Sequence, residues 1–103
     1  MSKKKAATLG TKADTERGFS VIDFTDGNDV PCTLQESSAW RESGPMLWLG
    51  CNKPNPRVLV HGKGWQPIGL PEGTLCDTRM HLGRKQVEAL VTTLQKWLKE
   101  GRL

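Results

Sequence analysis

The chain has 103 residues, enough for one small domain, and carries 15 Lys and Arg against 11 Asp and Glu, a formal net charge of +4. It contains no apolar run near the ~20 residues of a membrane-spanning helix, and its early lysines lack the apolar stretch of a secretory signal. A domain this small leaves about a third or more of its unfolded-chain surface exposed, which disfavours a deep catalytic cleft. These properties exclude a membrane-spanning protein and point to the cytoplasm.

Residues 1–17 hold most of the positive charge, with five basic and two acidic residues. They are small or charged, show no periodicity and are predicted to form a disordered basic leader. One interpretation is that the lysines keep this leader soluble. The alternative is that they hold phosphates, including those of a nucleic acid, or an acidic protein surface.

Two predicted strands follow, separated by a turn. Residues 19–24 are rich in β-branched and aromatic side chains, and residues 30–35 alternate apolar with polar positions. Residues 25–28 contain Asp-Gly, a dipeptide that supplies the positive φ of a tight hairpin. Pro31 has no amide to donate, so we expect it at an edge, a bulge or the start of its strand.

The middle of the chain alternates short strands with loops. Residues 46–51 form an apolar run that predicts a central strand buried on both faces, and residues 57–61 predict a further short strand. Residues 36–44 are predicted to be a polar link. Residues 62–73 hold four glycines and two prolines, which is typical of a long surface excursion. Residues 75–82 return to strand-like alternation.

The last segment has the spacing of an amphipathic helix, predicted over residues 84–99. We expect Leu90, Leu94 and Trp97 to pack on a sheet that contains Phe19, Val21, Leu47 and Leu49, because one helix cannot bury its own stripe. The predicted fold class is therefore α+β: a small antiparallel sheet of three to five strands with one C-terminal amphipathic helix packed on it. Residues 18–103 form a single predicted domain.

The junction before the helix is the best candidate for a small anionic ligand such as a nucleotide. Arg79, His81 and Arg84 bring positive charge to a helix start, where free amides and the helix dipole attract phosphate or carboxylate. Gly83, the predicted cap, offers those amides no side-chain acceptor. The plainer alternative is that water caps the helix and Arg79 pairs with Asp77 or Glu88.

Metal and catalytic motifs are weak. Cys32, Cys51 and Cys76 could form a zinc set with His61 or His81, but structural zinc sites usually take ligands in pairs two to four residues apart, and no such pair exists. Their odd number and wide spacing favour reduced thiols.

No nucleophile stands in a recognisable catalytic set. Cys32, Ser37 and Ser38 would each need a base and an orienting partner, and His81 is the one obvious base. The sequence therefore predicts neither an enzyme nor a cofactor.

Four tryptophans divide into two groups. Trp48 and Trp97 lie in apolar patterns and are predicted to be core, whereas the other two lie in polar or glycine-rich segments beside a basic residue. Exposed Trp with Arg or Lys is typical of a binding hot spot, although each Trp could instead cover the small core. The predicted partner-binding residues are Trp40, Arg41, Lys63 and Trp65.

Three segments together resemble a group of small proteins encoded by bacteriophages and prophages: FSVIDFTDGNDVPCTLQESSA, LWLG and RMHLGRKQVEALVTTLQKWLKEGRL. Members share a strand–turn–strand ending in C-T/S-L-Q-x-S-S, a W-L-G strand and an R-M-H-L junction before an amphipathic helix. They often have Thr or Ser where this chain has Gly83. The resemblance covers residues 19–50 and 76–103. It implies one fold, a phage context and a bacterial host cytoplasm, but no mechanism.

The small size, the predicted cytoplasmic location and the resemblance to phage-encoded proteins together predict a protein that acts by binding. The leading hypothesis is a stoichiometric binder and inhibitor of a host protein or nucleoprotein complex, active in counter-defence. The first alternative is the anion binder at the strand–helix junction. The second is a nucleic-acid-binding accessory protein that uses the basic leader.

Overall fold

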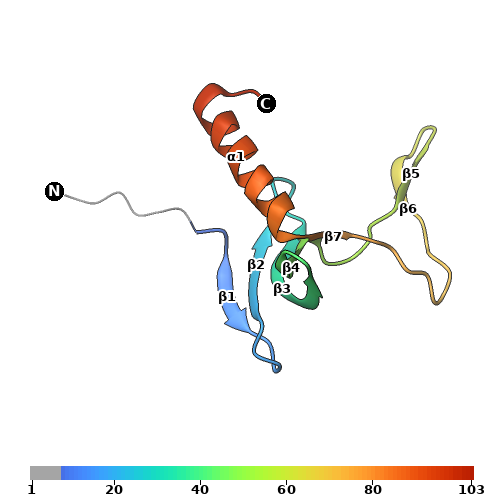
Figure 1. Ribbon diagram of the computed structural model, residues 1–103. Coiled ribbons are helices and arrows are strands. Elements are labelled where there is room, and N and C mark those ends of the chain that lie inside the picture. The colour runs from blue at the N-terminus through green and yellow to red at the C-terminus, as the bar shows by residue number, and fades with distance from the viewer. Residues whose placement is uncertain (1–7) are drawn as a thin grey trace.

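The computed structural model describes residues 8–103 and confirms the α+β class (Figure 1). Within these described residues, seven strands precede one C-terminal helix. The strands are β1 (Thr11–Asp14), β2 (Ser20–Thr25), β3 (Pro31–Arg41), β4 (Gly44–Cys51), β5 (Arg57–Val60), β6 (Gly64–Pro67) and β7 (Arg79–Leu82), and the helix is α1 (Arg84–Glu100).

Five strands form one antiparallel sheet in the order β1-β2-β3-β4-β7. Strand β4 lies between β3 and β7, which confirms the predicted interior strand, but the expected burial on both faces is wrong, because only Met46 of residues 46–51 is buried and the others are half-buried. Because side chains alternate across a sheet, the register sorts them onto two faces. The face called here the apolar face carries Ile22, Phe24, Cys32, Leu34, Leu47, Leu49, Cys51, Met80 and Leu82. The opposite, polar face carries Val21, Asp23, Thr33, Gln35, Trp48, Arg79 and His81.

The predicted leader boundary is wrong for part of its range. Residues 1–7 lie outside the described residues, but Thr11–Asp14 form an edge strand that pairs with β2. The turn back to β2 is held by Thr15, whose hydroxyl accepts the Phe19 N–H at 3.0 Å. All four β1 residues are exposed, so the strand has no apolar alternation by which its sequence could reveal it.

Strand β3 is longer than predicted, since it continues through the supposed polar link to Arg41. Pro31 stands at its first position, where a missing amide breaks no interior ladder. In the turn before it, the positive φ of 61° belongs to Asp29 rather than to Gly27, which corrects the expected turn geometry. The carboxylate of Asp26 closes this turn by accepting the N–H groups of Asn28 and Val30 at 2.8 and 3.1 Å.

Strands β5 and β6 form a separate two-stranded sheet. The predicted strand at 57–61 is confirmed, but the glycine-rich excursion contains a strand that was not expected. Leu59 pairs with Trp65, and both side chains are exposed. Figure 1 shows this hairpin projecting from the five-stranded sheet in a different direction from the helix. An isolated two-stranded hairpin is marginally stable in water, so this one needs cover.

Helix α1 begins one residue after Gly83 and ends within a residue of the predicted position. Gly101, with φ 73°, ends it by donating its N–H to the Trp97 carbonyl at 2.7 Å. Only the first turns approach the sheet, where Val87 and Leu90 are half-buried. The expected packing of Leu94 and Trp97 on the sheet is wrong, because 47% and 49% of these side chains remain exposed. The helix continues beyond the sheet instead of lying across it (Figure 1).

The core is correspondingly thin. Cys32 and Met46 are the buried hydrophobic residues of the described chain, and the radius of gyration is 17.6 Å against about 13 Å for a compact domain of 100 residues. The accessible surface is 9143 Å², whereas a compact monomer of 11.4 kDa exposes roughly 5,800 Å². More than roughly 2,000 Å² of surface therefore exceeds that of a compact fold.

Candidate functional site

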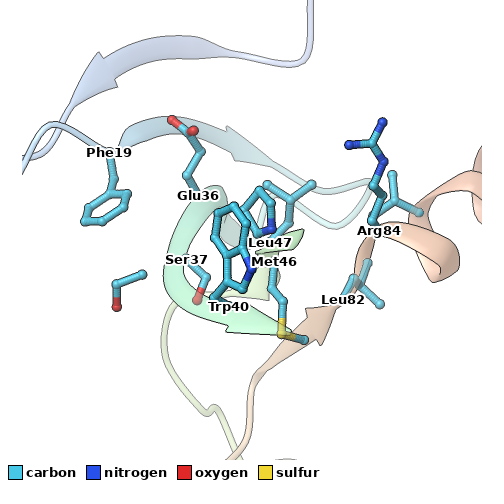
Figure 2. Close-up of a pocket in the computed structure, with 11 residues that line it drawn as sticks. Phe19, Glu36, Ser37, Trp40, Met46, Leu47, Leu82 and Arg84 are labelled. Atoms are coloured by element: carbon cyan, nitrogen blue, oxygen red, sulfur yellow. The ribbon is translucent and has the colours of Figure 1, made fainter. Parts of the chain in front are cut away.

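An apolar pocket of about 360 Å³ lies where β3, β4, the end of β7 and the start of α1 meet (Figure 2). In Figure 2, Phe19 and Arg84 lie at opposite ends of the group, with Trp40 between them. We call this cavity the Trp40 pocket. Its lining residues are Phe19, Glu36, Ser37, Ser38, Trp40, Pro45, Met46, Leu47, Leu82, Arg84 and Val87.

A bulge in β3 creates the pocket. Glu36 pairs with Leu47 and Trp40 pairs with Pro45, so the three residues 37–39 of β3 oppose the single residue Met46 of β4. Extra residues bend the bulged strand and re-aim its side chains. Beyond the bulge Trp40 is 70% exposed, an unusual position for an indole. The bulge therefore holds a large aromatic side chain at the rim of a cavity.

Ser37 fixes the bulge from within. It is buried, its hydroxyl accepts the Ala39 N–H at 3.0 Å, and the same oxygen lies 2.9 Å from His81 Nε2. The bulge is thereby tied to β7 across β4. Sequence reasoning weighed Ser37 as a nucleophile, whereas the structure places its hydroxyl in these internal hydrogen bonds.

Two opposite charges lie at the rim of the Trp40 pocket. Hydrogen bonds from the backbone and side chain of Ser20 lower the pKa of Glu36, with a smaller contribution from the positive charge of Lys12. Arg84 stands on the helix side and its Nε lies 3.5 Å from the Glu88 carboxylate. The pocket thus combines an apolar lining with a negative group on the sheet and a positive group on the helix.

The four predicted partner-binding residues fall into two separate places. Trp40 and Arg41 end strand β3, whereas Lys63 and Trp65 belong to the β5–β6 hairpin, where Trp65 is 64% exposed. The two tryptophans lie on different sheets, so the structure does not join them into one surface. Trp40 stands beside a cavity lined mainly by apolar side chains, whereas Trp65 borders one lined by Asn55 and Arg57.

Arg79 and His81, two of the predicted anion-binding residues, share the polar face. His81 stacks on Trp48 with ring centroids 3.8 Å apart and planes 9° apart. The Arg79 guanidinium carbon lies 5.5 Å from the centre of the same indole, and its Nη1 donates to the side-chain oxygen of Gln35 at 3.1 Å. Trp48 is half-buried on the polar face, where the His81 ring and the Arg79 guanidinium lie against its indole, so the predicted core position is only partly realised.

Gly83 and Arg84, the other two predicted anion-binding residues, make contacts in different places. The Gly83 N–H donates to the side-chain oxygen of Gln86 at 2.9 Å, and Arg84 lines the Trp40 pocket. The structure therefore brings Arg79 and His81 together but does not add Arg84 to them. Anion binding at this junction stays a prediction, and an anion would have to displace the contacts with Gln35 and Ser37.

The cysteines lie in the sheet and beside it. Cys32 and Cys51 are directly opposite each other on the apolar face, and Cys51 Sγ donates to the Thr78 carbonyl at 3.6 Å. Burial raises the pKa of the Cys32 thiol, helped by the nearby Asp26 carboxylate, which makes this thiol a poor nucleophile. His81 occupies the opposite face from Cys51, and no three potential ligands cluster within residues 8–103.

Sequence reasoning missed most of the Trp40 pocket. Leu47 of β4 pairs directly with Leu82 of β7. The apolar pattern of these two segments indicated strands, but it did not indicate a cavity. The cavity depends on the β3 bulge, whose sequence signal is the Ser37-Ser38-Ala39 run of small residues before Trp40. Such a run is equally typical of a loop, which is how it was interpreted.

Comparison with protein-family models, curated protein sequences and solved structures found no match to this chain. The resemblance to phage-encoded proteins therefore stays a prediction from the sequence. Within residues 8–103, no helix combines the length and apolar composition needed to cross a bilayer.

Proposed function

We propose that the protein acts by stoichiometric binding to another protein, whose anchoring apolar side chain enters the Trp40 pocket. The observation that supports this most directly is an exposed indole at the rim of an apolar cavity of about 360 Å³. Pockets flanked by Trp and Arg, with apolar walls and few polar groups, are typical of interface hot spots. Glu36 and Arg84 at the rim would orient the partner through opposite charges.

The expected partner follows from the sequence resemblance. A phage context makes a bacterial host protein, alone or in a nucleoprotein complex, the proposed target, and inhibition in counter-defence the proposed outcome. The accessible surface exceeds that of a compact monomer and many large apolar side chains are exposed, which supports a role in complexes.

The test is affinity capture from bacterial host lysate with the full chain, followed by calorimetry with the purified captured protein. Trp40→Ala is expected to weaken binding about 30-fold or more, since truncating a buried aromatic anchor usually costs about 2 kcal/mol or more. Trp65→Ala is the matched control, because its indole is similarly exposed but lies on the other sheet. The control is expected to bind as the unmodified chain does.

Other outcomes would support a different binding surface or a different function. Loss of binding in Trp65→Ala with full binding in Trp40→Ala would move the surface to the β5–β6 hairpin and refute the pocket. Loss only in Arg79→Ala, with a nucleotide co-purifying, would favour the anion-binding alternative. Capture of salt-sensitive nucleic acid, lost when the basic N-terminal residues are removed, would favour the nucleic-acid accessory.

A further inference from the structure

The β5–β6 hairpin lies within a stretch of the chain that carries positive charge and no negative charge. All 11 Asp and Glu residues lie outside residues 43–71, whereas this stretch contains Lys53, Arg57 and Lys63. All three basic side chains are exposed, and none of them makes an ion pair with a residue that the structure describes. The hairpin and the loop before it therefore present uncompensated cations to solvent.

One face of the hairpin combines an indole with this charge. Residues paired across two antiparallel strands share a face, as do residues two apart on one strand. Arg57, Leu59, Trp65 and Pro67 therefore share one face, with Leu59 directly opposite Trp65. Leu59 is 62% exposed and Trp65 is 64% exposed, so neither side chain belongs to a core.

Trp65, Arg57 and Asn55 line a shared hollow of about 310 Å³. Within the described part of the chain, no aromatic ring or guanidinium stacks on the Trp65 indole, in contrast to Trp48, on which His81 stacks. The hollow thus offers an open aromatic surface, a cation, and a carboxamide that can both donate and accept hydrogen bonds.

We propose that this face binds single-stranded nucleic acid, with a base stacked on Trp65 and the adjacent phosphates held by Arg57 and Lys63. Along the hairpin the indole lies between these two cations. Trp65 is two residues from Lys63 in the turn, and it is opposite Leu59, which is two residues from Arg57. Aromatic stacking surfaces beside cations bind single strands without reading their sequence, because every base has a π-face.

Hydrogen bonds hold the hairpin in this form at both ends. At the turn, the Lys63 N–H donates to the Val60 carbonyl at 3.0 Å. At the other end, the Ile68 N–H donates to the Pro56 carbonyl at 3.1 Å. Trp65 is therefore presented by an ordered element, which lowers the conformational entropy that binding costs.

The charge distribution favours nucleic acid over an acidic protein surface. Interfaces with nucleic acid are much more positively charged than interfaces between proteins, from which Lys is depleted. The hairpin also projects from the five-stranded sheet in a direction of its own, which leaves it open to an extended polymer (Figure 1). A duplex fits this face less well, because its bases are stacked on one another and cannot reach the indole.

The test is fluorescence anisotropy of labelled oligothymidylate and oligouridylate, each of about 12 nucleotides, titrated with the full chain. A dissociation constant on the order of 1–100 µM is expected near physiological salt, as for binding without sequence preference. A DNA duplex of the same length should bind more weakly. Comparison of the two oligonucleotides shows whether the hairpin prefers DNA or RNA.

Trp65→Leu keeps an apolar side chain opposite Leu59 but removes the stacking surface, so it should weaken binding about 5-fold or more. Trp65→Phe keeps an aromatic ring and should retain most of the affinity. Lys63→Gln should weaken binding and reduce the slope of log affinity against log salt by about 0.7, whereas the Trp65 variants should leave this slope unchanged. Trp40→Ala, an exposed indole on the other sheet, is the control and should bind the oligonucleotide as the unmodified chain does.

Binding that Trp65→Leu leaves unchanged would overturn the proposal. If that binding were lost in the combined variant Lys3→Gln, Lys4→Gln and Lys5→Gln, it would belong to the N-terminal lysines instead. Equal affinity for polyglutamate would also overturn the proposal, in favour of an acidic protein partner. So would tighter binding of the duplex, or no binding of either oligonucleotide at about 100 µM protein.

Discussion

The hydroxyl of Ser37 connects two features that are distant in the sequence, the bulge of β3 and strand β7. It accepts the N–H of Ala39, the residue directly before Trp40, and lies beside the ring of His81 in the strand before the helix. At the residue scale, the site therefore depends on one small buried polar group. This buried hydroxyl is costly to remove, because the half-buried Ala39 N–H and His81 ring would lose their partner.

Ser37→Ala is expected to lower the free energy of unfolding by about 1–3 kcal/mol, the usual cost of leaving buried hydrogen-bonding groups without a partner. Urea denaturation measures the change. Ser38→Ala, at the neighbouring exposed position, is the control and should stay within about 0.5 kcal/mol of the unmodified chain. Equal stability of the two variants would contradict the role given to Ser37.

Glu36 makes stability depend on pH. Its pKa is lowered in the folded chain by hydrogen bonds from Ser20, so its contribution is present above the ordinary value of 4.5 and is lost as the pH falls through the folded value. Glu36→Gln should therefore be less stable than the unmodified chain near neutral pH, by a small amount because the carboxylate is exposed. The difference should vanish under acid conditions.

Urea midpoints of both proteins between about pH 3 and pH 7 measure this effect. A difference between the two proteins that stays constant over this range, or that grows toward acid, would show that Glu36 has no favourable contact with Ser20. The same carboxylate borders the Trp40 pocket, so partner binding should be measured at one fixed pH.

At the scale of elements, helix α1 starts with a weak cap. Gly83 has an extended backbone, with φ −83° and ψ 168°, and offers no side-chain acceptor to the first-turn amides. Gln86 compensates in part by accepting the Gly83 N–H. The first turn also lacks an acidic residue. The helix therefore begins without two of the common devices that stabilise an N-terminus.

Gly83→Asp supplies both devices and should stabilise the chain by about 0.5–1 kcal/mol. A Cβ at this position meets only the Gln86 side-chain oxygen, at 3.8 Å, so no clash opposes the change. Thermal unfolding followed by circular dichroism measures it. Gly83→Ala adds the same Cβ without a side-chain acceptor, so it should be less stable than the Asp variant. An Asp variant no more stable than the Ala variant would contradict this account of the cap.

The elements that the sequence predicted best are those with a clear local period. The α1 spacing and the alternation in β2 and β4 gave correct types and nearly correct bounds. Strand β1 was missed because its four residues are all exposed and are held by pairing with β2 rather than by burial. Strand β6 was missed because Gly64 and Pro67 bound it, and both residues are typical of loops.

The candidate site was predicted less well, for a physical reason. Trp40 was identified because an indole in a polar segment is costly to expose, but its pocket arises from a bulge that aligns residues of four elements. Amino-acid composition predicts neither how many extra residues a bulge contains nor the strand register beside it. Trp40 and Trp65 were treated alike, and only the topology separates them.

At the scale of the whole molecule, the helix period correctly identified which side chains need cover but not which surface provides it. The sequence interpretation assigned Leu94 and Trp97 to the sheet of the same chain, and both are half-exposed in the structure. Hydrophobic patterning is a property of one segment, whereas cover can come from the same chain or from another.

Gly50 is a position of the sheet at which a side chain cannot be accommodated. Its φ is 152°, and a Cβ there would clash with the Thr78 carbonyl oxygen and stand 2.7 Å from the Arg79 Cα. Strand β7 can therefore approach β4 only where position 50 has no side chain. Since β7 leads directly into α1, the attachment of the last quarter of the chain depends on a residue without a side chain, which pairs with Arg79 through its backbone. Natural variants of this chain could exchange many surface residues of β7 and α1, but each should retain glycine at position 50.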